Sequence, residues 1–177
     1  MSPREGTVSN AFERSNSIMP SATAPRPFDS PTALAALAAV PDVAIGQSDW
    51  LAVTQEMINA FADLTGDRQW IHVDVERARR EAPGGQTIAH GYLLVGLIGV
   101  LQPQIFSVVC PTVLNYGMNK LRFLTAVPSG SRVRLSQAVK SAEQVKGGWR
   151  IEFVSTLEVE GQQRPGFVAE IVFQYQG

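Results

Sequence analysis

The sequence predicts an α+β fold in which an antiparallel sheet wraps around a buried helix. The first observation is the segment 90–101, which is apolar on nearly every side of a helix and, being too short to span lipid, has to be enclosed by protein. The second is a change to a period of two after this segment, in runs that turn residues separate. The four strand-like runs cover residues 113–126, 131–142, 149–160 and 167–176.

The N-terminal part is predicted to contribute little to this fold. Residues 1–30 are rich in Ser and Pro. They offer too few large apolar groups to offset the entropy cost of ordering, so we expect a disordered tail. Pro31 can open a short helix that ends before Pro41, and we expect this helix, within residues 31–41, to be a peripheral addition. The main domain then covers residues 42–177.

Local signals place a strand and a helix at the start of the main domain. Residues 43–53 form a predicted strand that Gly46 interrupts. Thr54 can cap the following helix, and Gly66 is suited to the left-handed position that ends one. The apolar face of this helix is predicted from the spacing of Met57, Ile58, Phe61 and Leu64.

The later elements carry similar signals at their ends. Asp74 can cap a helix over Val75–Glu81, which the Pro83-Gly84-Gly85 cluster ends. The apolar helix over 90–101 is expected to end before Pro103. Three connections between the predicted strands have hairpin-like sequences, namely Pro128-Ser129-Gly130, Lys146-Gly147-Gly148 and Glu160-Gly161.

Composition argues against several classes of protein. Lys plus Arg (15) nearly balances Asp plus Glu (16), so the formal charge is -1 and no basic field is available for nucleic acid. The longest apolar run, 93–101, is far shorter than the roughly 20 residues of a membrane span. Cys110 is the only cysteine, which excludes an internal disulfide and fits a reducing compartment. We therefore expect a cytoplasmic protein with neither a nucleic-acid nor a membrane partner.

Asp67 and His72 are the candidate catalytic residues. Asp67 follows the predicted helix end at Gly66, and His72 follows four residues later in what we expect to be a loop. A tight turn can bring the carboxylate and the imidazole to the same water molecule, where one group takes a proton and the other orients the water. The spacing alone leaves another interpretation open, in which the aspartate is a turn former and the histidine is structural.

Gly91 is the candidate binding residue. It lies at the predicted start of the apolar helix, where main-chain N–H groups have no intrahelical partner and can hold a developing oxyanion. The alternative is that glycine here only permits close packing. We expect a structural role for His90. Two histidines and scattered carboxylates show no metal-ligand spacing, and we expect neither a metal nor an organic cofactor.

Three stretches of the chain form a combined motif, namely Thr65-Gly66-Asp67-Arg68-Gln69-Trp70-Ile71-His72-Val73-Asp74, Thr87-Ile88-Ala89-His90-Gly91-Tyr92-Leu93, and Leu114-Asn115-Tyr116-Gly117 through Lys120-Leu121-Arg122-Phe123. Together they resemble the MaoC-like dehydratase family, which includes (R)-specific enoyl-CoA hydratases and the NodN-like proteins. The resemblance covers about residues 43–176, and its later part looks like the NodN-like branch. It implies a hotdog fold with the 90–101 helix as the filling.

The resemblance implies roles for the candidate residues. The family's catalytic pair carries over to Asp67 and His72, and its oxyanion-binding amide carries over to Gly91. The implied reaction is reversible syn addition of water to a trans-2-enoyl thioester, on coenzyme A or an acyl carrier, in an assembly expected to be a homodimer. Where many relatives have Asn-Pro, this chain has Gln69-Trp70, and Gly96 stands where many have a serine. These two departures bear on the choice of acyl chain.

Two other functions remain open on the same fold. An acyl-CoA thioesterase would release free thiol instead of consuming the enoyl group. A non-catalytic acyl-binding protein would bind thioesters without turnover. The intact spacing between Asp67 and His72 favours hydration over both.

Overall fold

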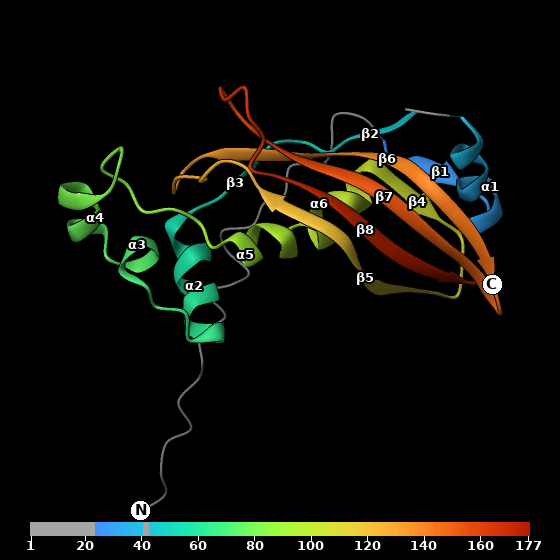
Figure 1. Ribbon diagram of the computed structural model, residues 1–177, viewed down its shortest axis with the longest axis horizontal. Helices are drawn as coiled ribbons and strands as arrows, with labels where there is room; N and C mark the ends of the chain where they lie inside the picture. The colour runs from blue at the N-terminus through green and yellow to red at the C-terminus, as the bar shows by residue number, and fades with distance from the viewer. Residues whose placement is uncertain (1–23, 41–42) are drawn as a thin grey trace, which may run out of the picture.

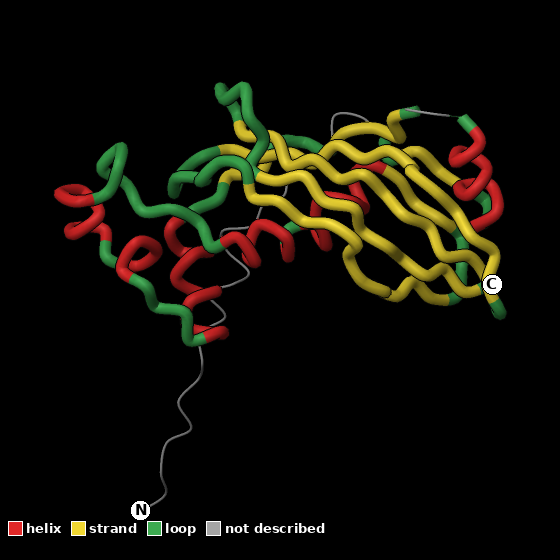
Figure 2. Tube along the Cα trace, viewed as in Figure 1, coloured by secondary structure: helices red, strands yellow, loops and turns green. Residues whose placement is uncertain are grey.

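The computed structural model describes residues 24–40 and 43–177, and its main feature is one large antiparallel sheet. Six strands take part in the order β2-β6-β7-β8-β5, with β3 also pairing with β6 (Figures 1 and 2). The sheet curls over two helices, which confirms the predicted α+β hotdog class. Its strands are β2 (Ala44–Gln47), β3 (Leu51–Ala52), β5 (Thr112–Phe123), β6 (Arg132–Val145), β7 (Gly148–Val159) and β8 (Phe167–Gln176).

The predicted central helix is divided into two. It is observed as α5 (Gly91–Gly96) and α6 (Ile98–Ile105), which run along one face of the sheet (Figure 1). Pro103 lies inside α6, so the prediction that the helix ends before this residue is wrong. Leu101 and Ile105 are buried on either side of Pro103, and their packing holds the chain helical beyond the proline.

One face of these helices is open in the single chain, although complete enclosure was expected. Tyr92 is 72% exposed, and Gly96, Gly99 and Pro103 are exposed along the same stripe. The spacing of four, three and four residues puts these positions on one side of a helix. The opposite side carries the buried residues Leu93, Leu94, Leu97, Ile98, Leu101 and Ile105.

The core lies between the helices and the concave face of the sheet. Burial alternates along β7, as expected for a strand with one buried face. Phe153 is fully buried there and stacks on Phe106 with ring centroids 5.7 Å apart. The other fully buried large side chains of the sheet include Leu135, Ile151, Leu157 and Phe167.

Two of the three predicted hairpins are confirmed. Residues Lys146-Gly147 join β6 to its neighbour β7, with Gly147 at a φ of 83°, and Glu160-Gly161 lies between the paired strands β7 and β8. The prediction for Pro128-Ser129-Gly130 is wrong. That segment crosses from β5 to β6, and the strands β7 and β8 lie between these two in the sheet.

The N-terminal part contributes more than the sequence suggested. The tail prediction for residues 1–23 falls outside the described residues, but strand β1 (Arg26–Phe28) pairs in parallel with β4 (Phe106–Val108). Disorder up to residue 30 is therefore wrong. Phe28 is buried against Phe106, with the two rings edge to face at 6.1 Å. This contact supplies the apolar burial that the composition of the tail seemed to lack.

The helix predicted at Pro31 is present but not peripheral. It forms α1 (Pro31–Ala35), capped by Ser30, and continues as the 3₁₀ helix η2 (Ala36–Ala39). Leu34 has no exposed surface and belongs to the same core as the sheet. The folded unit therefore includes residues on the N-terminal side of the predicted boundary at 42.

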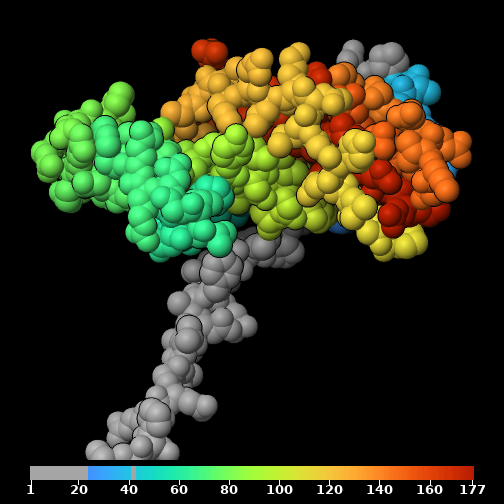
Figure 3. Space-filling view, turned by 60° about the horizontal axis from the view of Figure 1, so that its bottom comes forward, coloured from blue at the N-terminus to red at the C-terminus, as the bar shows by residue number. Residues whose placement is uncertain are grey.

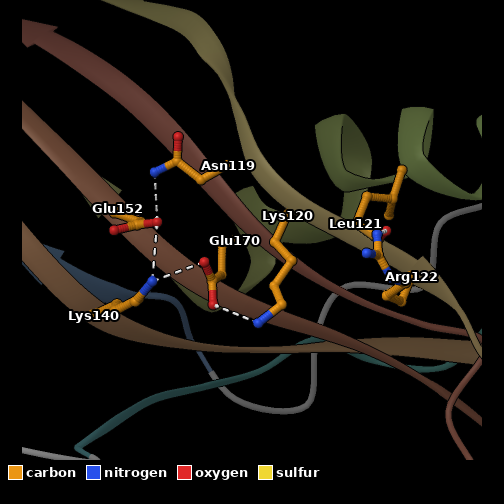
Figure 4. A network of polar contacts seen from close by, with 7 residues as sticks. All are labelled: Asn119, Lys120, Leu121, Arg122, Lys140, Glu152 and Glu170. Carbon is orange, nitrogen blue, oxygen red and sulfur yellow. Dashed lines mark hydrogen bonds and ion pairs between the residues drawn. The ribbon is translucent and has the colours of Figure 1, made fainter.

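A polar network on the outer face ties the edge strand β5 into the sheet (Figure 4). Lys140 on β6 bridges Glu170 on β8 at 2.8 Å and Glu152 on β7 at 3.3 Å. Asn119 on β5 donates to Glu152 at 2.8 Å. Partial burial would raise the pKa of Glu152, but hydrogen bonds from Asn119, Ser141 and Lys140 outweigh it and hold that pKa below its ordinary value. The network links all four long strands, and β5 carries Phe123 at the candidate site.

None of the helices within residues 24–40 and 43–177 has the length and apolar character that crossing a membrane requires.

Candidate active site

Asp67 lies in the turn after α2 (Gln55–Thr65), as predicted. Thr54 caps the start of this helix, and Gly66 ends it in the left-handed conformation with a φ of 80°. The Asp67 side chain is exposed, and its carboxylate accepts a long hydrogen bond of 3.4 Å from the amide of Gln69. Leu64 is 84% exposed, so its placement on the buried face of the helix was wrong.

His72 is more enclosed than a loop position would suggest. It belongs to the short helix α3 (Trp70–Val73), and its side chain is buried. Its Nδ1 lies 2.7 Å from the carbonyl oxygen of Ile88. A carbonyl can only accept, so Nδ1 carries the proton and, in the neutral ring, Nε2 is left as an acceptor. Main-chain geometry thereby fixes the tautomer of the imidazole.

Two side chains that the sequence analysis did not single out hold the main chain of His72. Gln55 donates from Nε2 to the carbonyl of His72 at 2.7 Å. The hydroxyl of Thr87 donates in turn to Oε1 of Gln55. Gln55 is 17 residues from His72 and Thr87 is 32 residues from Gln55, and no local pattern marks either contact.

The structure brings together Asp67, His72 and a third residue, His90. Side-chain atoms of all three lie within 4.8 Å of one another. The rings of His72 and His90 stack at 3.8 Å with 25° between their planes. A metal ion binds close to the plane of each imidazole that holds it, and two nearly parallel rings do not meet this condition for one ion. The cluster therefore favours acid–base chemistry over chelation.

Gly91 is the first residue of α5, and its amide belongs to the first turn, where the helix offers no acceptor. The ring of Phe123 covers this position so closely that a Cβ on Gly91 would meet ring atoms at 2.7–2.9 Å. A pocket of about 420 Å³ opens here beside His72. Apolar groups dominate its lining. The lining residues are His72, Ile88, Ala89, Gly91, Tyr92, Leu94, Phe123, Leu124, Thr125, Ala126 and Val127.

The two departures noted in the sequence lie away from this pocket wall. The Trp70 ring is covered by the guanidinium of Arg77, 4.3 Å from the ring centroid, and does not line the pocket. Gly96 is exposed, and a Cβ there would meet no atom of the described residues within 4 Å. Their expected effect on the choice of acyl chain stays a prediction.

Comparison with known proteins agrees with this geometry. Residues 37–161 match the sequence profile of the MaoC like domain. The chain belongs to the MaoC-like dehydratase family. It is 47% identical to the 3-hydroxyacyl-thioester dehydratase Z of Mycobacterium tuberculosis over 152 residues, which is 85% of this chain and 98% of that protein.

One further relative supports the assignment to this family, and one solved structure supports the fold. The nodulation protein N of Rhizobium leguminosarum is 40% identical over 131 residues, 71% of this chain and 80% of that protein, in agreement with the NodN-like resemblance. An unliganded R-hydratase from Pseudomonas aeruginosa superposes with a TM-score of 0.62 at 20% identity, covering 78% of this chain and 84% of that one. At that identity the superposition supports the hotdog fold alone.

Proposed function

We propose that the protein is an (R)-specific enoyl thioester hydratase, acting reversibly as a 3-hydroxyacyl thioester dehydratase. The observation that carries the proposal is the approach of the Asp67 carboxylate to the imidazole of His72, which lines a mostly apolar pocket together with Gly91. The identity to the 3-hydroxyacyl-thioester dehydratase supports it. The substrate is a trans-2-enoyl thioester on coenzyme A or an acyl carrier, and the reaction needs no cofactor.

In this proposal Asp67 and His72 hold one water molecule. His72 accepts one hydrogen of the water at Nε2, because its Nδ1 proton is donated to Ile88. Asp67 accepts the other hydrogen, so the lone pair of the water oxygen is free to attack C3 of the enoyl group. As the C3–O bond forms, the π electrons move towards the thioester carbonyl and the proton passes to Asp67.

Gly91 stabilises the enolate intermediate. Its amide donates to the thioester oxygen, which gains negative charge as the enolate forms. The enolate then collapses, and C2 takes the proton from Asp67 on the face that received the oxygen. Dehydration follows the same steps in reverse. The mostly apolar walls of the pocket accept the acyl chain.

The purified protein is expected to consume the enoyl absorbance of crotonyl-CoA and to form the (3R)-hydroxyacyl product. Loss of the enoyl signal, chirality of the product and free thiol are measured together across several acyl chain lengths. Thiol release without loss of the enoyl group would replace hydration by thioester hydrolysis. Binding without either change would leave only an acyl-binding role.

We also propose that the protein forms a homodimer through β5 and the open face of α5 and α6. Atoms of these segments lie side by side on one face (Figure 3). Because β5 is an edge strand, its outer main-chain groups are unpaired within the sheet. A second copy brings the same unpaired groups and the same apolar surface, so a two-fold axis can pair both. Five apolar side chains of β5 are 44–58% exposed, namely Val113, Leu114, Tyr116, Met118 and Phe123.

Sedimentation is expected to give the mass of two chains of 19.2 kDa each at micromolar concentration. Leu114→Glu is expected to shift this equilibrium to the monomer, because it places a charge on the apolar edge. Leu64→Glu is the matched control, since Leu64 is exposed on α2 and outside this surface. A wild-type monomer, or equal dissociation by both variants, would contradict the proposal. The cytoplasmic location expected from the sequence remains a prediction.

A further inference from the structure

His90 contacts both members of the proposed catalytic pair. Its Nε2 lies 2.9 Å from the main-chain oxygen of Asp67, and its ring stacks on that of His72. On its other side the ring meets Phe61, with centroids 5.0 Å apart. We propose that His90 is a positioning residue that fixes Asp67 and His72 relative to the Gly91 amide. The inference rests on the proposed hydratase function and adds a third side chain to its site.

The hydrogen bond from His90 is the shortest that Asp67 itself makes, in a turn where Arg68 also donates from its amide to Gly66 at 3.0 Å and pairs with Asp63 at 2.7 Å. The side chain of Asp67 is exposed. The other two hydrogen bonds of this residue are both 3.4 Å long: its main-chain amide donates to the hydroxyl of Thr65, and its carboxylate accepts from the amide of Gln69. The carbonyl can only accept, so His90 donates from Nε2. At 2.9 Å, the hydrogen bond from His90 is shorter and stronger than these two, and it restrains the position of Asp67.

His90 also connects the base to the oxyanion site. It occupies the N-cap position of α5, directly before Gly91, but its side chain makes no capping hydrogen bond to that helix. The ring is turned towards Asp67 instead. One residue therefore links the start of α5, which carries the Gly91 amide, to the turn that carries Asp67 and to the ring of His72.

A purely structural role does not account for the choice of histidine here. His90 is only 3% exposed, and with Nε2 donating, Nδ1 is a buried acceptor that has no partner within residues 24–40 and 43–177. An unpaired buried nitrogen is unfavourable, and phenylalanine would fill the same apolar space between Phe61 and His72 without it. What histidine adds over phenylalanine is the donor to Asp67.

Two substitutions separate the contributions of the ring and the donor. His90→Phe keeps a planar ring for stacking and removes the donor. His90→Gln removes the ring and keeps an amide donor near the position of Nε2. We expect His90→Phe to lower kcat for crotonyl-CoA hydration about 10- to 100-fold with KM changed less than about threefold, because misplacement of a reacting group by about 1 Å costs about that much. His90→Gln is expected to recover most of the loss.

A double-substitution cycle tests whether His90 acts through Asp67. In the Asp67→Asn background, His90→Phe is expected to cost less than about threefold, because the base that it positions is already lost. If His90→Phe lowered kcat by the same factor in the Asp67→Asn background as in the wild type, the proposal would be overturned. A wild-type kcat in the His90→Phe variant would also overturn it. If His90→Phe does not fold, His90→Gln and His90→Asn carry the test, since the shorter Asn places its amide near Nδ1. Equal activity of those two would then reject it.

The failure of this inference differs from the failure of the proposed function. A wild-type protein that hydrates crotonyl-CoA, together with an unimpaired His90→Phe variant, rejects only the role of His90. A wild-type protein that hydrates no enoyl thioester rejects both. Nitrogen NMR of the imidazoles gives an independent readout, because the proposal requires His90 to carry its proton on Nε2 and His72 on Nδ1. The opposite tautomer of His90 would reject it.

Discussion

Asp67→Asn is expected to lower kcat for enoyl thioester hydration by about 10²- to 10⁴-fold. The asparagine oxygen can still accept a hydrogen bond from water, but it cannot take the proton. KM and thermal stability are expected to change little, because the side chain is exposed and His90 binds the main-chain oxygen, which asparagine retains. Initial rates with crotonyl-CoA and a thermal melt measure both.

A matched control is available on the same helix end. Asp63 is also exposed, and it pairs with Arg68 at 2.7 Å. Asp63→Asn is therefore expected to keep wild-type activity. If Asp67→Asn retained activity within a few fold of wild type, the assignment of the base would be wrong.

His72→Gln is expected to cause a loss of similar size, because the imidazole that holds the water is removed. Since His72 is buried, its variants can also affect folding. His72→Asn keeps an amide donor near Nδ1 for the carbonyl of Ile88 while removing Nε2. A folded His72→Asn variant with wild-type activity would argue against the role of His72.

Local signals in the sequence predict the ends of elements well in this protein. The cap at Thr54, the left-handed Gly66 and the cap at Asp74 all act within three or four residues of the chain. Such short-range preferences need no knowledge of the rest of the fold. The hairpin at Lys146-Gly147 is of the same kind.

Partner choice in the sheet is a long-range property, and the local sequence does not predict it. Nothing in Pro128-Ser129-Gly130 distinguishes a hairpin from a crossing connection, and β5 pairs with β8, the last strand of the chain. The burial of Phe28 similarly depends on Phe106, which lies far along the sequence. In the proposed homodimer the open stripe at Tyr92 meets a second copy, and a pattern within one chain does not reveal that contact.

The residues of the candidate site also fall into two groups, those that the sequence predicts and those that depend on long-range contacts. Asp67 and His72 lie close together in the sequence, and the family resemblance predicts both of them, as well as Gly91, as site residues. The role of Gln55 depends on a contact with His72, 17 residues away, and that of His90 on a contact with Asp67, 23 residues away. No spacing in the sequence predicts either contact. The position of a histidine directly before the helix start is a signal in the sequence, but it fits a structural role for His90 equally well.

The Gly91 amide can be tested with two substitutions that both add a Cβ. Both Gly91→Ala and Gly91→Pro add a Cβ, which would meet the ring of Phe123 at 2.7–2.9 Å and move it. Only proline removes the N–H. Gly91 is the first residue of α5, where proline is tolerated, and His90 before it has a ψ of 138°, as the residue preceding a proline requires.

Gly91→Pro is expected to lower kcat about 10²- to 10³-fold relative to Gly91→Ala, because one oxyanion donor is lost. Gly91→Ala itself is expected to show a smaller loss, which Phe123→Leu in the same chain should partly restore by relieving the contact with Cβ. Initial rates and thermal melts of the four proteins, including wild type, separate the effects. Equal activity of the alanine and proline variants would show that the thioester oxygen takes no hydrogen bond from Gly91, because proline lacks the N–H that alanine keeps and puts Cδ in its place.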